Sequence, residues 1–383
     1  MAIGPSSPSS RRRPLREVAL LFLKLGIVGF GGPAAHIALM RAEVVRRRRW
    51  VDDARFLDLL GMTNLIPGPN STEMAIHLGY VRAGAAGLVV GGACFILPAM
   101  TIVLALAWAY AHYGARPEAT AALYGIKPVI IAVVVQAAWA LTRSAVKGPL
   151  LALVGVVTIA LYALGVHELV LLIGAGLALV AARWLRGGHA APVLVLAVSS
   201  AVPGAVSVGA AVSLTTLCLT FLKIGAVLYG SGYVLLAFLR RDFVERLAWL
   251  TDRQLLDAVA IGQFTPGPVF TTATFIGYVL AGWTGGVLAT VAIFLPSFVF
   301  VALSRPLIPK IRSSTSAGLF LDGVNVAALG LMATVAWQLG RAAIVDVITA
   351  LLALSAAVVL VLFRVNSAWL VLGGAVVGIV AMR

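Results

Sequence analysis

Three long stretches of this chain carry no Asp, Glu, Lys or Arg, and they constrain its fold more than any other feature. They cover residues 83–115, 187–222 and 258–304, and are 33, 36 and 47 residues long. Each exceeds the roughly 20 apolar residues that cross a hydrocarbon core as a helix. A membrane β-barrel would need strands of about 10 residues that alternate apolar with polar side chains. These stretches are apolar on every face, so they predict an all-α polytopic membrane protein.

The charge balance agrees with that class. Only 11% of the residues are charged, against roughly 25% in soluble domains. The 29 Lys and Arg outnumber the 14 Asp and Glu, and most lie in short loops, where they orient a membrane protein. We therefore expect no nucleic acid partner. Cys94 and Cys218 each lie alone in an apolar stretch, which predicts neither a disulfide nor a metal site.

The chain repeats itself at a spacing of 199 residues. Without a gap, 17 of the 48 positions from Phe22 to Pro69 are identical to their partners, and Pro-Gly-Pro at 67–69 matches Pro-Gly-Pro at 266–268. After one deletion near residue 75 the match resumes at a spacing of 198, with Pro98 on Pro296. The sequence therefore predicts two homologous halves.

Each half begins with an apolar segment interrupted by glycines, followed by a charged loop and two short pieces around Pro-Gly-Pro. Neither short piece can span a membrane alone, so we expect broken or re-entrant helices there. The expected helices of the first half are 17–40, 55–66, 69–81, 84–113, 119–142, 148–164 and 168–185. The expected parts of the chain are a disordered basic tail (1–14), a first transmembrane repeat (15–189), a connecting apolar segment (190–212) and a second repeat (213–383).

The distribution of Lys and Arg predicts how the halves are oriented. Basic clusters at 11–16 and 41–55 flank the first apolar segment on both sides, so either one cluster breaks the positive-inside rule or the segment folds back as a hairpin at 29–33. We favour the hairpin, because the later loops then alternate acceptably. The segment 190–212 becomes an extra crossing, and the halves become inverted repeats, a known transporter plan.

Pro-Gly-Pro in the membrane points to an anion site. The prolines remove backbone donors and start a new helix just after each motif. The free N–H groups at a helix start carry a partial positive charge that suits an oxyanion. A simple kink capped by neighbouring helices is the alternative, which the repetition of the motif disfavours. The candidate substrate-binding residues are Lys24, Gly31, Gly32, Pro67, Gly68, Pro69, Asn70, Ser71, Thr72, Lys223, Gly230, Pro266, Gly267, Pro268, Thr271 and Thr272.

Several ionisable residues extend this hypothesis. Lys24 and Lys223 occupy equivalent positions and could attract an anion, although Lys24 could also snorkel to the interface. Glu73 could couple transport to protons by protonating as the anion binds, or it could simply cap a helix start. Lys127 and its partner Asn325 are secondary candidates. We find no phosphate-binding loop, nucleophile elbow or metal motif, so we expect no enzyme activity, no metal and no cofactor.

At these residues the sequence resembles the chromate ion transporter family, in its long two-domain form. The resemblance rests on FLKLGIVGFGGP from Phe22, on FLKIG from Phe221 and on the two Pro-Gly-Pro motifs. It covers nearly the whole chain and implies export of chromate from the bacterial cytoplasm across the inner membrane, through two halves of opposite orientation. The second copy departs from the first where Gly32 becomes Ser231 and Asn70 becomes Val269, so one half could bind while the other gates.

The sequence therefore predicts a multi-pass secondary transporter of the bacterial cytoplasmic membrane, driven by protons or membrane potential. Its expected cargo is chromate, and its other expected partners are the lipid bilayer and a second copy in a homodimer. Sulfate is the natural look-alike of chromate, since both are tetrahedral dianions. The alternatives are an importer of sulfate or another oxyanion, and a passive anion channel. In a transporter, one half would rock against the other to alternate access.

Overall fold

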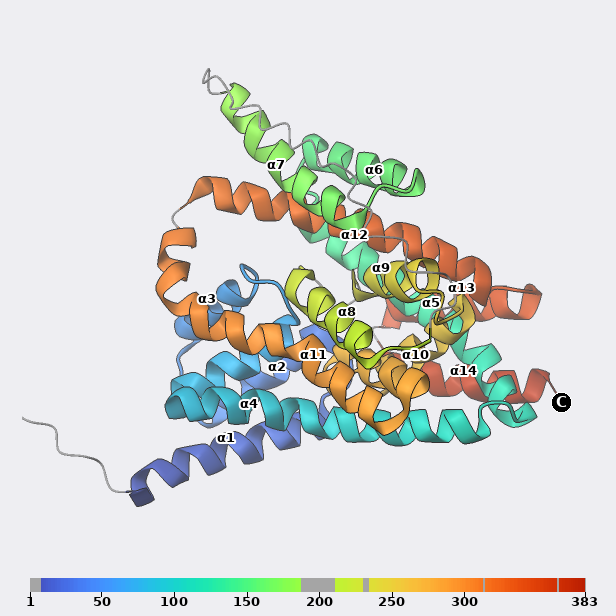
Figure 1. Ribbon diagram of the computed structural model, residues 1–383, viewed down its shortest axis with the longest axis horizontal. Helices are drawn as coiled ribbons and strands as arrows, with labels where there is room; N and C mark the ends of the chain where they lie inside the picture. Colours follow the sequence, from blue (N-terminus) through green and yellow to red (C-terminus); the bar gives the residue numbers. More distant parts are fainter. Residues whose placement is uncertain (1–7, 187–210, 230–233, 313, 364, 383) are drawn as a thin grey trace, which may run out of the picture. The chain divides into compact units, whose positions relative to one another are not determined.

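The computed structural model describes residues 8–186, 211–229, 234–312, 314–363 and 365–382, which form helices and no β-strand (Figure 1). This confirms the prediction of an all-α chain. The helices of the first half are α1 (Pro8–Val28), α2 (Gly32–Arg41), α3 (Asp53–Thr63), α4 (Asn70–Tyr113), α5 (Pro117–Ala145), α6 (Pro149–Ala163) and α7 (Glu168–Arg186). Those of the second half are α8 (Leu214–Val227), α9 (Leu235–Leu239), α10 (Asp252–Phe264), α11 (Thr272–Arg312), α12 (Thr315–Ala343), α13 (Val347–Phe363) and α14 (Ser367–Ala381).

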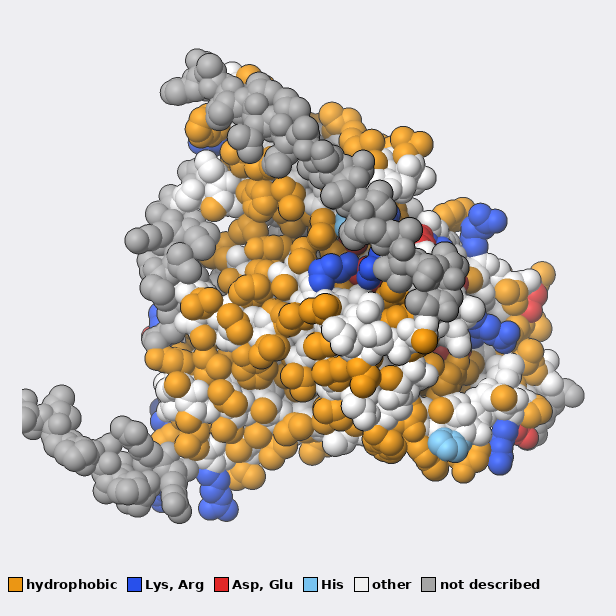
Figure 2. Space-filling model, in the orientation of Figure 1, with side chains coloured by type: hydrophobic (Ala, Val, Ile, Leu, Met, Phe, Trp, Pro, Cys, Tyr) orange, Lys and Arg blue, Asp and Glu red, His pale blue; other side chains and the backbone are white. Residues whose placement is uncertain are grey.

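The described helices are suited to a membrane. Five of them are long and apolar enough to cross one, namely α4, α5, α7, α11 and α12, and four shorter helices are also apolar. Hydrophobic side chains cover most of the described surface that faces the viewer in Figure 2. Soluble proteins rarely expose so large an apolar surface to water. The chain is therefore a multi-pass membrane protein.

The first apolar segment breaks where its glycines predicted. Helix α1 ends at Val28 and α2 starts at Gly32, after Gly31 with a φ of +102°. Beyond the break, Glu43 Oε1 lies 2.9 Å from Lys24 Nζ, 19 residues earlier in the chain. A continuous helix would separate these positions by about 28 Å. The chain therefore turns back at the glycines, as the hairpin prediction required.

Both Pro-Gly-Pro motifs lie between short helical pieces. In the first half the motif separates α3 from residues 70–82 of α4, a piece only about 20 Å long. Helix α4 then reverses at Ala83 and Gly84, where Gly84 has a φ of +65°. Gly79 and Gly87 pack against each other across this turn. Helix α11 reverses in the same way at Gly282, with a φ of +61°. The predicted half-helices are confirmed.

The chain divides into two compact units that cut across the two sequence halves. Unit 1 comprises Met1–Gly114, Leu214–Gly232 and Ile261–Arg305, and unit 2 comprises Ala115–Ser213, Tyr233–Ala260 and Pro306–Arg383. Each unit takes segments from both halves. Both Pro-Gly-Pro motifs therefore belong to unit 1. A movement of one sequence half against the other, as the repeats alone suggested, would have to divide both units.

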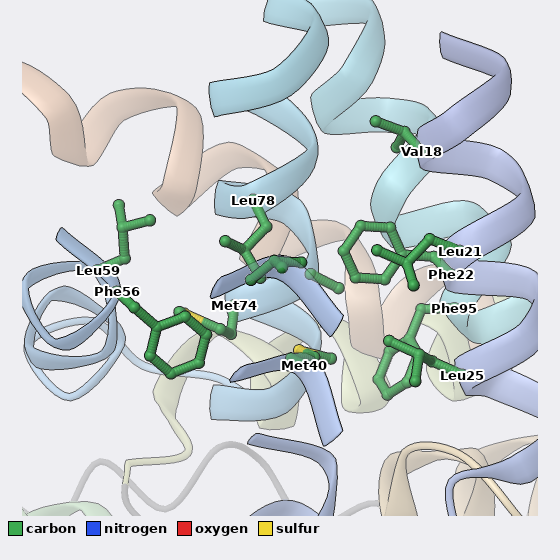
Figure 3. Close-up of a cluster of buried hydrophobic side chains, with 12 residues drawn as sticks. Val18, Leu21, Phe22, Leu25, Met40, Phe56, Leu59, Met74, Leu78 and Phe95 are labelled. Atoms are coloured by element: carbon green, nitrogen blue, oxygen red, sulfur yellow. The ribbon is translucent and has the colours of Figure 1, made fainter. Parts of the chain in front are cut away.

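The core of unit 1 packs around the glycine break at 29–33. Side chains of α1, α2, α3 and α4 form one buried apolar cluster (Figure 3). In it, the rings of Phe22 and Phe95 meet edge to face at 6.5 Å, and His36 meets Phe95 at 5.4 Å. His36 Nε2 lies 2.9 Å from the carbonyl oxygen of Gly29, so the apolar core and the broken backbone are fixed together.

Unit 2 is a bundle in which α5 and α12 are central. Helix α5 packs on α12, α13 and α14, and α12 also packs on α6 and α7. Gly125 of α5 and Gly374 of α14 touch so closely that neither could carry a side chain. Small residues at such contacts let membrane helices approach one another.

Two further expectations concern the N-terminal tail and the connecting segment. Helix α1 begins at Pro8, so residues 8–14, which we expected in a disordered tail, lie in its first turns; arginine is a good helix former, which favours this extension. The expected connecting segment 190–212 falls largely on residues 187–210, and these lie outside the described residues, as does Gly230.

Candidate functional site: two linked breaks in unit 1

Each Pro-Gly-Pro motif is hydrogen bonded to the glycine break of the other half. The Gly68 N–H donates to the carbonyl oxygen of Leu228 at 2.8 Å, and the Gly267 N–H donates to that of Gly29, also at 2.8 Å. Because Gly29 and Leu228 are repeat partners, and Gly68 and Gly267 are too, the two bonds are reciprocal. The four broken segments therefore form one linked assembly inside unit 1.

The first Pro-Gly-Pro motif, at 67–69, is the first break, and the second motif, at 266–268, is the second. The polar surroundings of the first break centre on Glu73. Its side chain is fully buried, and a Cβ atom on Gly68 would overlap its Oε1. The hydroxyl of Ser297, from α11, faces the carboxylate, and the phenol of Tyr229 lies within its electrostatic reach. Among the described residues, no basic side chain comes within 4 Å of Glu73. An acid so placed in a membrane is a functional candidate by default.

The helix start after the first motif is buried and incompletely bonded. Thr72 and Glu73 donate their backbone N–H groups to the carbonyl of Pro69 at 2.8 and 3.0 Å. The Thr72 hydroxyl is fully buried and makes no hydrogen bond within the described ranges. Asn70 donates instead to Asn64 Oδ1 at 2.6 Å. At the first helix start the Thr72 hydroxyl is therefore available to a ligand, whereas the Asn70 side chain is hydrogen bonded to Asn64 in the preceding loop.

The second helix start uses its hydroxyls locally. Thr271 Oγ1 donates to the carbonyl of Pro268, and Thr272 Oγ1 donates to that of Val269, both at 2.8 Å. These hydroxyls were expected to supply donors to an anion, but here their protons are already bound. A Cβ atom on Gly267 would lie 2.7 Å from that of Ala99. The second break is thus more apolar than the first.

The predicted lysines are not equivalent in their surroundings. Lys24 is half exposed and pairs with Glu43, which also binds Arg47 and Arg48 at 2.9 and 3.4 Å. These contacts, the Lys24 hydrogen bond first, hold the pKa of Glu43 below its usual range. Lys24 is therefore directed to the charged loop after α2. Lys223 is half-buried on α8 and has interactions of its own.

Lys127 has a partner that sequence reasoning missed. Its Nζ lies 2.9 Å from Asp257 Oδ1, inside unit 2, and both side chains are almost fully buried. Asn325, the repeat partner of Lys127, is half-buried on α12. The secondary candidates thus belong to unit 2, whereas both Pro-Gly-Pro motifs belong to unit 1.

Ser297, His36 and Asp257 were also absent from the predicted site. The repeat carried a signal for two of them: Ser297 follows Pro296, the partner of Pro98, and Asp257 is the partner of Asp58. The rest of the predicted set surrounds the breaks, with Pro67 and Gly32 half-buried, Gly31 exposed, and Pro69, Ser71, Pro266 and Pro268 buried. Among the described residues, no group of three His, Cys, Asp or Glu side chains could hold a metal ion.

Broken helices meeting in an apolar, duplicated helical chain define a multi-pass membrane protein built from two homologous halves. The family model described as "Chromate transporter" matches residues 16–181 and 215–379, one match in each half. The chain belongs to the chromate transporter family. This confirms the resemblance seen in the sequence.

Curated relatives extend over most of the chain. The chromate transport protein of Cupriavidus metallidurans is 35% identical over 374 residues, covering 96% of this chain and 93% of that protein. The chromate transport protein of Pseudomonas aeruginosa is 33% identical over 325 residues, covering 81% and 77%. No solved structure matches the chain.

Proposed function

We propose that this protein is a secondary transporter that exports chromate from the bacterial cytoplasm across the inner membrane. The observation that carries the proposal is the reciprocal pair of hydrogen bonds, Gly68 to Leu228 and Gly267 to Gly29. They join two unwound segments and two helix starts in one unit. Non-helical backbone at membrane depth is tolerated where protein buries it or where it lines a polar cavity. The named function of the relatives supports chromate as the cargo.

Three contacts inside unit 2 support an inverted arrangement of the halves. Arg241 pairs with Glu168 at 2.9 Å, Lys147 pairs with Asp322 at 2.9 Å, and Tyr124 donates to Asp346 at 2.5 Å. Each contact joins a residue of the first half to one of the second. In inverted repeats both members of each pair lie near the same face of the membrane, whereas parallel repeats would place them near opposite faces.

Two loops of equal backbone support the same orientation. The first has a π-helical turn followed by Arg49 with a φ of +53°, and the second has the same turn followed by Ala248 with a φ of +51°. Arg46–Arg49 in the first loop become Glu-Arg-Leu-Ala at 245–248 in the second. Loss of cations on one matched backbone is what the positive-inside rule favours for an outer loop. The segment 190–212 would supply the extra crossing.

In this proposal the anion binds at the first break and the second break mainly gates. The Gly68 and Thr72 N–H groups already bond to Leu228 and Pro69, so the binding groups are the positive helix start at Ser71 and the unbonded Thr72 hydroxyl, which favour an oxyanion. Glu73 couples export to protons, because a charged carboxylate beside a dianion is unfavourable and a protonated one is not. The protein acts as a transporter with no covalent chemistry, alone or as a homodimer.

The decisive experiment is counterflow of labelled chromate into proteoliposomes that contain only this protein. The proposal expects saturable exchange, weaker inhibition by sulfate than by chromate, and accumulation driven by an imposed proton gradient or membrane potential. Current without saturable exchange would identify a passive channel instead. Faster exchange of sulfate, with net uptake in cells, would identify an importer of another oxyanion.

A further inference from the structure

Four polar side-chain atoms at the first break are buried and have no hydrogen-bond partner among the described residues. They are Thr72 Oγ1, both carboxylate oxygens of Glu73 and Ser297 Oγ, and all four belong to unit 1. The Glu73 and Ser297 side chains converge, since a Cβ atom on Gly68 would meet Glu73 Oε1 and Ser297 Oγ together. Buried polar atoms in proteins are nearly always satisfied by protein, water or a ligand. The cluster therefore indicates a site for a ligand that pairs with its oxygens.

Tyr229 adds a second hydroxyl group to the surroundings of Glu73. It follows Leu228, whose carbonyl oxygen accepts the Gly68 N–H at 2.8 Å, so its backbone is fixed beside the motif. Its half-buried phenol, also in unit 1, interacts electrostatically with Glu73. The groups that face the acid from other elements are thus hydroxyl groups, one from α11 and one from the segment after α8.

The other titratable groups of the neighbouring helices have partners elsewhere. On α1, Lys24 pairs with Glu43, and on α2 the His36 ring lies against the carbonyl oxygen of Gly29. Further interactions engage Asp58 of α3, His77 of α4 and Lys223 of α8. A proton that enters this cluster therefore has Glu73 as its first candidate acceptor, and His77, one helical turn further on, as the second.

The polar groups are specific to the first break. In the repeat, Ser297 corresponds to Ala99 and Tyr229 to Phe30, while Glu73 aligns with a threonine. Phe30 stands in the same backbone position as Tyr229, directly after the residue whose carbonyl oxygen accepts from the other Pro-Gly-Pro. The second break thus keeps the backbone contact and lacks the acid with its two hydroxyl neighbours.

The protonation state of Glu73 decides how many donors the cluster offers to an anion. An ionised carboxylate only accepts hydrogen bonds, so it would take up the hydroxyl protons of Ser297 and Tyr229. A protonated Glu73 supplies an O–H donor of its own and leaves both hydroxyls free to donate. Because a tetrahedral dianion such as chromate has only acceptor oxygens, it fits the protonated arrangement alone.

We propose that Glu73, Ser297 and Tyr229 form a donor switch, in which one proton bound by Glu73 converts the cluster from acceptors into donors for the anion. The switch rests on the proposed transport function and deepens it, since it makes Ser297 and Tyr229 anion-binding residues. It also requires one proton to bind with each dianion. The dianion and its proton together carry one net negative charge, which an inside-negative membrane potential drives outward.

Proton uptake on chromate binding tests the switch. Calorimetric titration of the full-length protein with chromate, in buffers of different ionisation enthalpy, measures the protons bound per anion. Between about pH 7.5 and about pH 9, where chromate remains a dianion, we expect uptake of about one proton and an affinity that falls by up to about tenfold per pH unit. Binding without proton uptake would overturn the switch.

Variants assign the proton and the donors. Glu73→Gln keeps a donor but cannot titrate, so it should bind chromate without proton uptake and with the same affinity at both pH values. Ser297→Ala and Tyr229→Phe should each weaken chromate binding by about fivefold to tenfold, since each removes one donor to a charged ligand. Wild-type affinity in both variants would overturn the switch.

Tyr278→Phe provides a matched control for Tyr229→Phe. Tyr278 also belongs to unit 1 and loses the same atom, but its ring packs against Trp283 at 5.2 Å in α11. Its removal should change chromate affinity by less than about twofold. An equal loss in both tyrosine variants would overturn the role of Tyr229.

Two further results would overturn the switch. Proton uptake that persists in Glu73→Gln and disappears in His77→Gln would assign the proton to His77. Inhibition by hydrogen phosphate that strengthens towards alkaline pH would show that ionised Glu73 accepts a proton carried by the anion.

Failure of the switch and failure of transport are distinguishable. Saturable counterflow by a protein that binds chromate without proton uptake overturns the switch alone. A protein that neither binds nor exchanges chromate overturns the proposed function, and the switch with it. Should Glu73→Gln not fold, proton uptake by the wild-type protein and the affinity of Tyr229→Phe still decide the question.

Discussion

At the first Pro-Gly-Pro, Gly68 is crowded by the Glu73 carboxylate and the Ser297 hydroxyl, whereas at the second, Gly267 faces the methyl group of Ala99. Both motifs hold glycine at a positive φ and make reciprocal hydrogen bonds, although a 3-10 turn follows only the second. Duplication therefore conserved the unwound geometry, while the chemistry of the two copies diverged. Similar backbone geometry at the two Pro-Gly-Pro motifs therefore does not give them the same chemical surroundings.

The largest effect should come from adding a methyl group at each break. Gly68→Ala would place Cβ 2.6 Å from Ser297 Oγ and onto the Glu73 carboxylate, at a φ of +141°, and should cost about 3 kcal/mol of stability. Gly267→Ala, at a φ of +93°, should cost about 2 kcal/mol, because it meets a single methyl group. Thermal unfolding in detergent measures both.

Removing the methyl group of Ala99 tests whether this contact sets the cost of Gly267→Ala. Adding Ala99→Gly to Gly267→Ala should recover about 1 kcal/mol, since it relieves the clash and leaves only backbone strain. The same Ala99→Gly change should give no recovery in Gly68→Ala. Equal recovery in both would mean that the two breaks do not differ in the way described.

The next effect concerns the acid that only the first break carries. Glu73→Gln cannot exchange a proton, so proton-driven accumulation of chromate should fall by about tenfold or more, while downhill counterflow persists. Thr272→Val, at one of the two threonines that align with Glu73, removes a hydroxyl that already bonds a carbonyl and should leave coupling intact. Proteoliposomes with and without an imposed pH gradient make the measurement. Loss of coupling in Thr272→Val alone would exchange the roles of the halves.

Much of this comparison was predictable from the sequence. Proline and glycine act on the backbone locally, so the breaks at 29–33 and 67–69 could be placed without a structure, whereas only a helix boundary, and no reversal, was expected near Gly84. The duplication carried each of them into the second half. Contacts between distant residues could not be placed in the same way. Gly68 meets Leu228, and Lys127 meets Asp257, across more than a hundred residues of chain.

The predicted roles of single side chains were less secure for a related reason. A hydroxyl or cation near a helix start can bind a ligand or a neighbour, and only packing decides between them. Thr271 and Lys24 were chosen for their position, yet the first donates to Pro268 and the second pairs with Glu43. Composition could not reveal these competing acceptors.

A smaller effect should follow from exchanging the residues that face the two glycines. Ser297→Ala removes the hydroxyl that faces Glu73, and should change the transport rate by about fivefold, equivalent to about 1 kcal/mol. The reverse change, Ala99→Ser, should have less effect, because the described atoms nearest to Gly267 include no carboxylate. Rates of chromate counterflow compare the two. A larger effect of Ala99→Ser would locate the polar site at the second break.

The smallest effect tests the charged loop after α2. Glu43 binds Lys24, Arg47 and Arg48, and these contacts lower its pKa in the folded protein. A lowered pKa stabilises the fold above the unfolded-state pKa, and this stability is lost as the pH falls through the folded-state value. Glu43→Gln should therefore cost about 0.5 kcal/mol near pH 7 and almost nothing near pH 3, since its partners are solvated. Thermal unfolding of both proteins across that range measures the difference. A cost that persists in acid would assign Glu43 a packing role, and would leave Lys24 free to act at the first break.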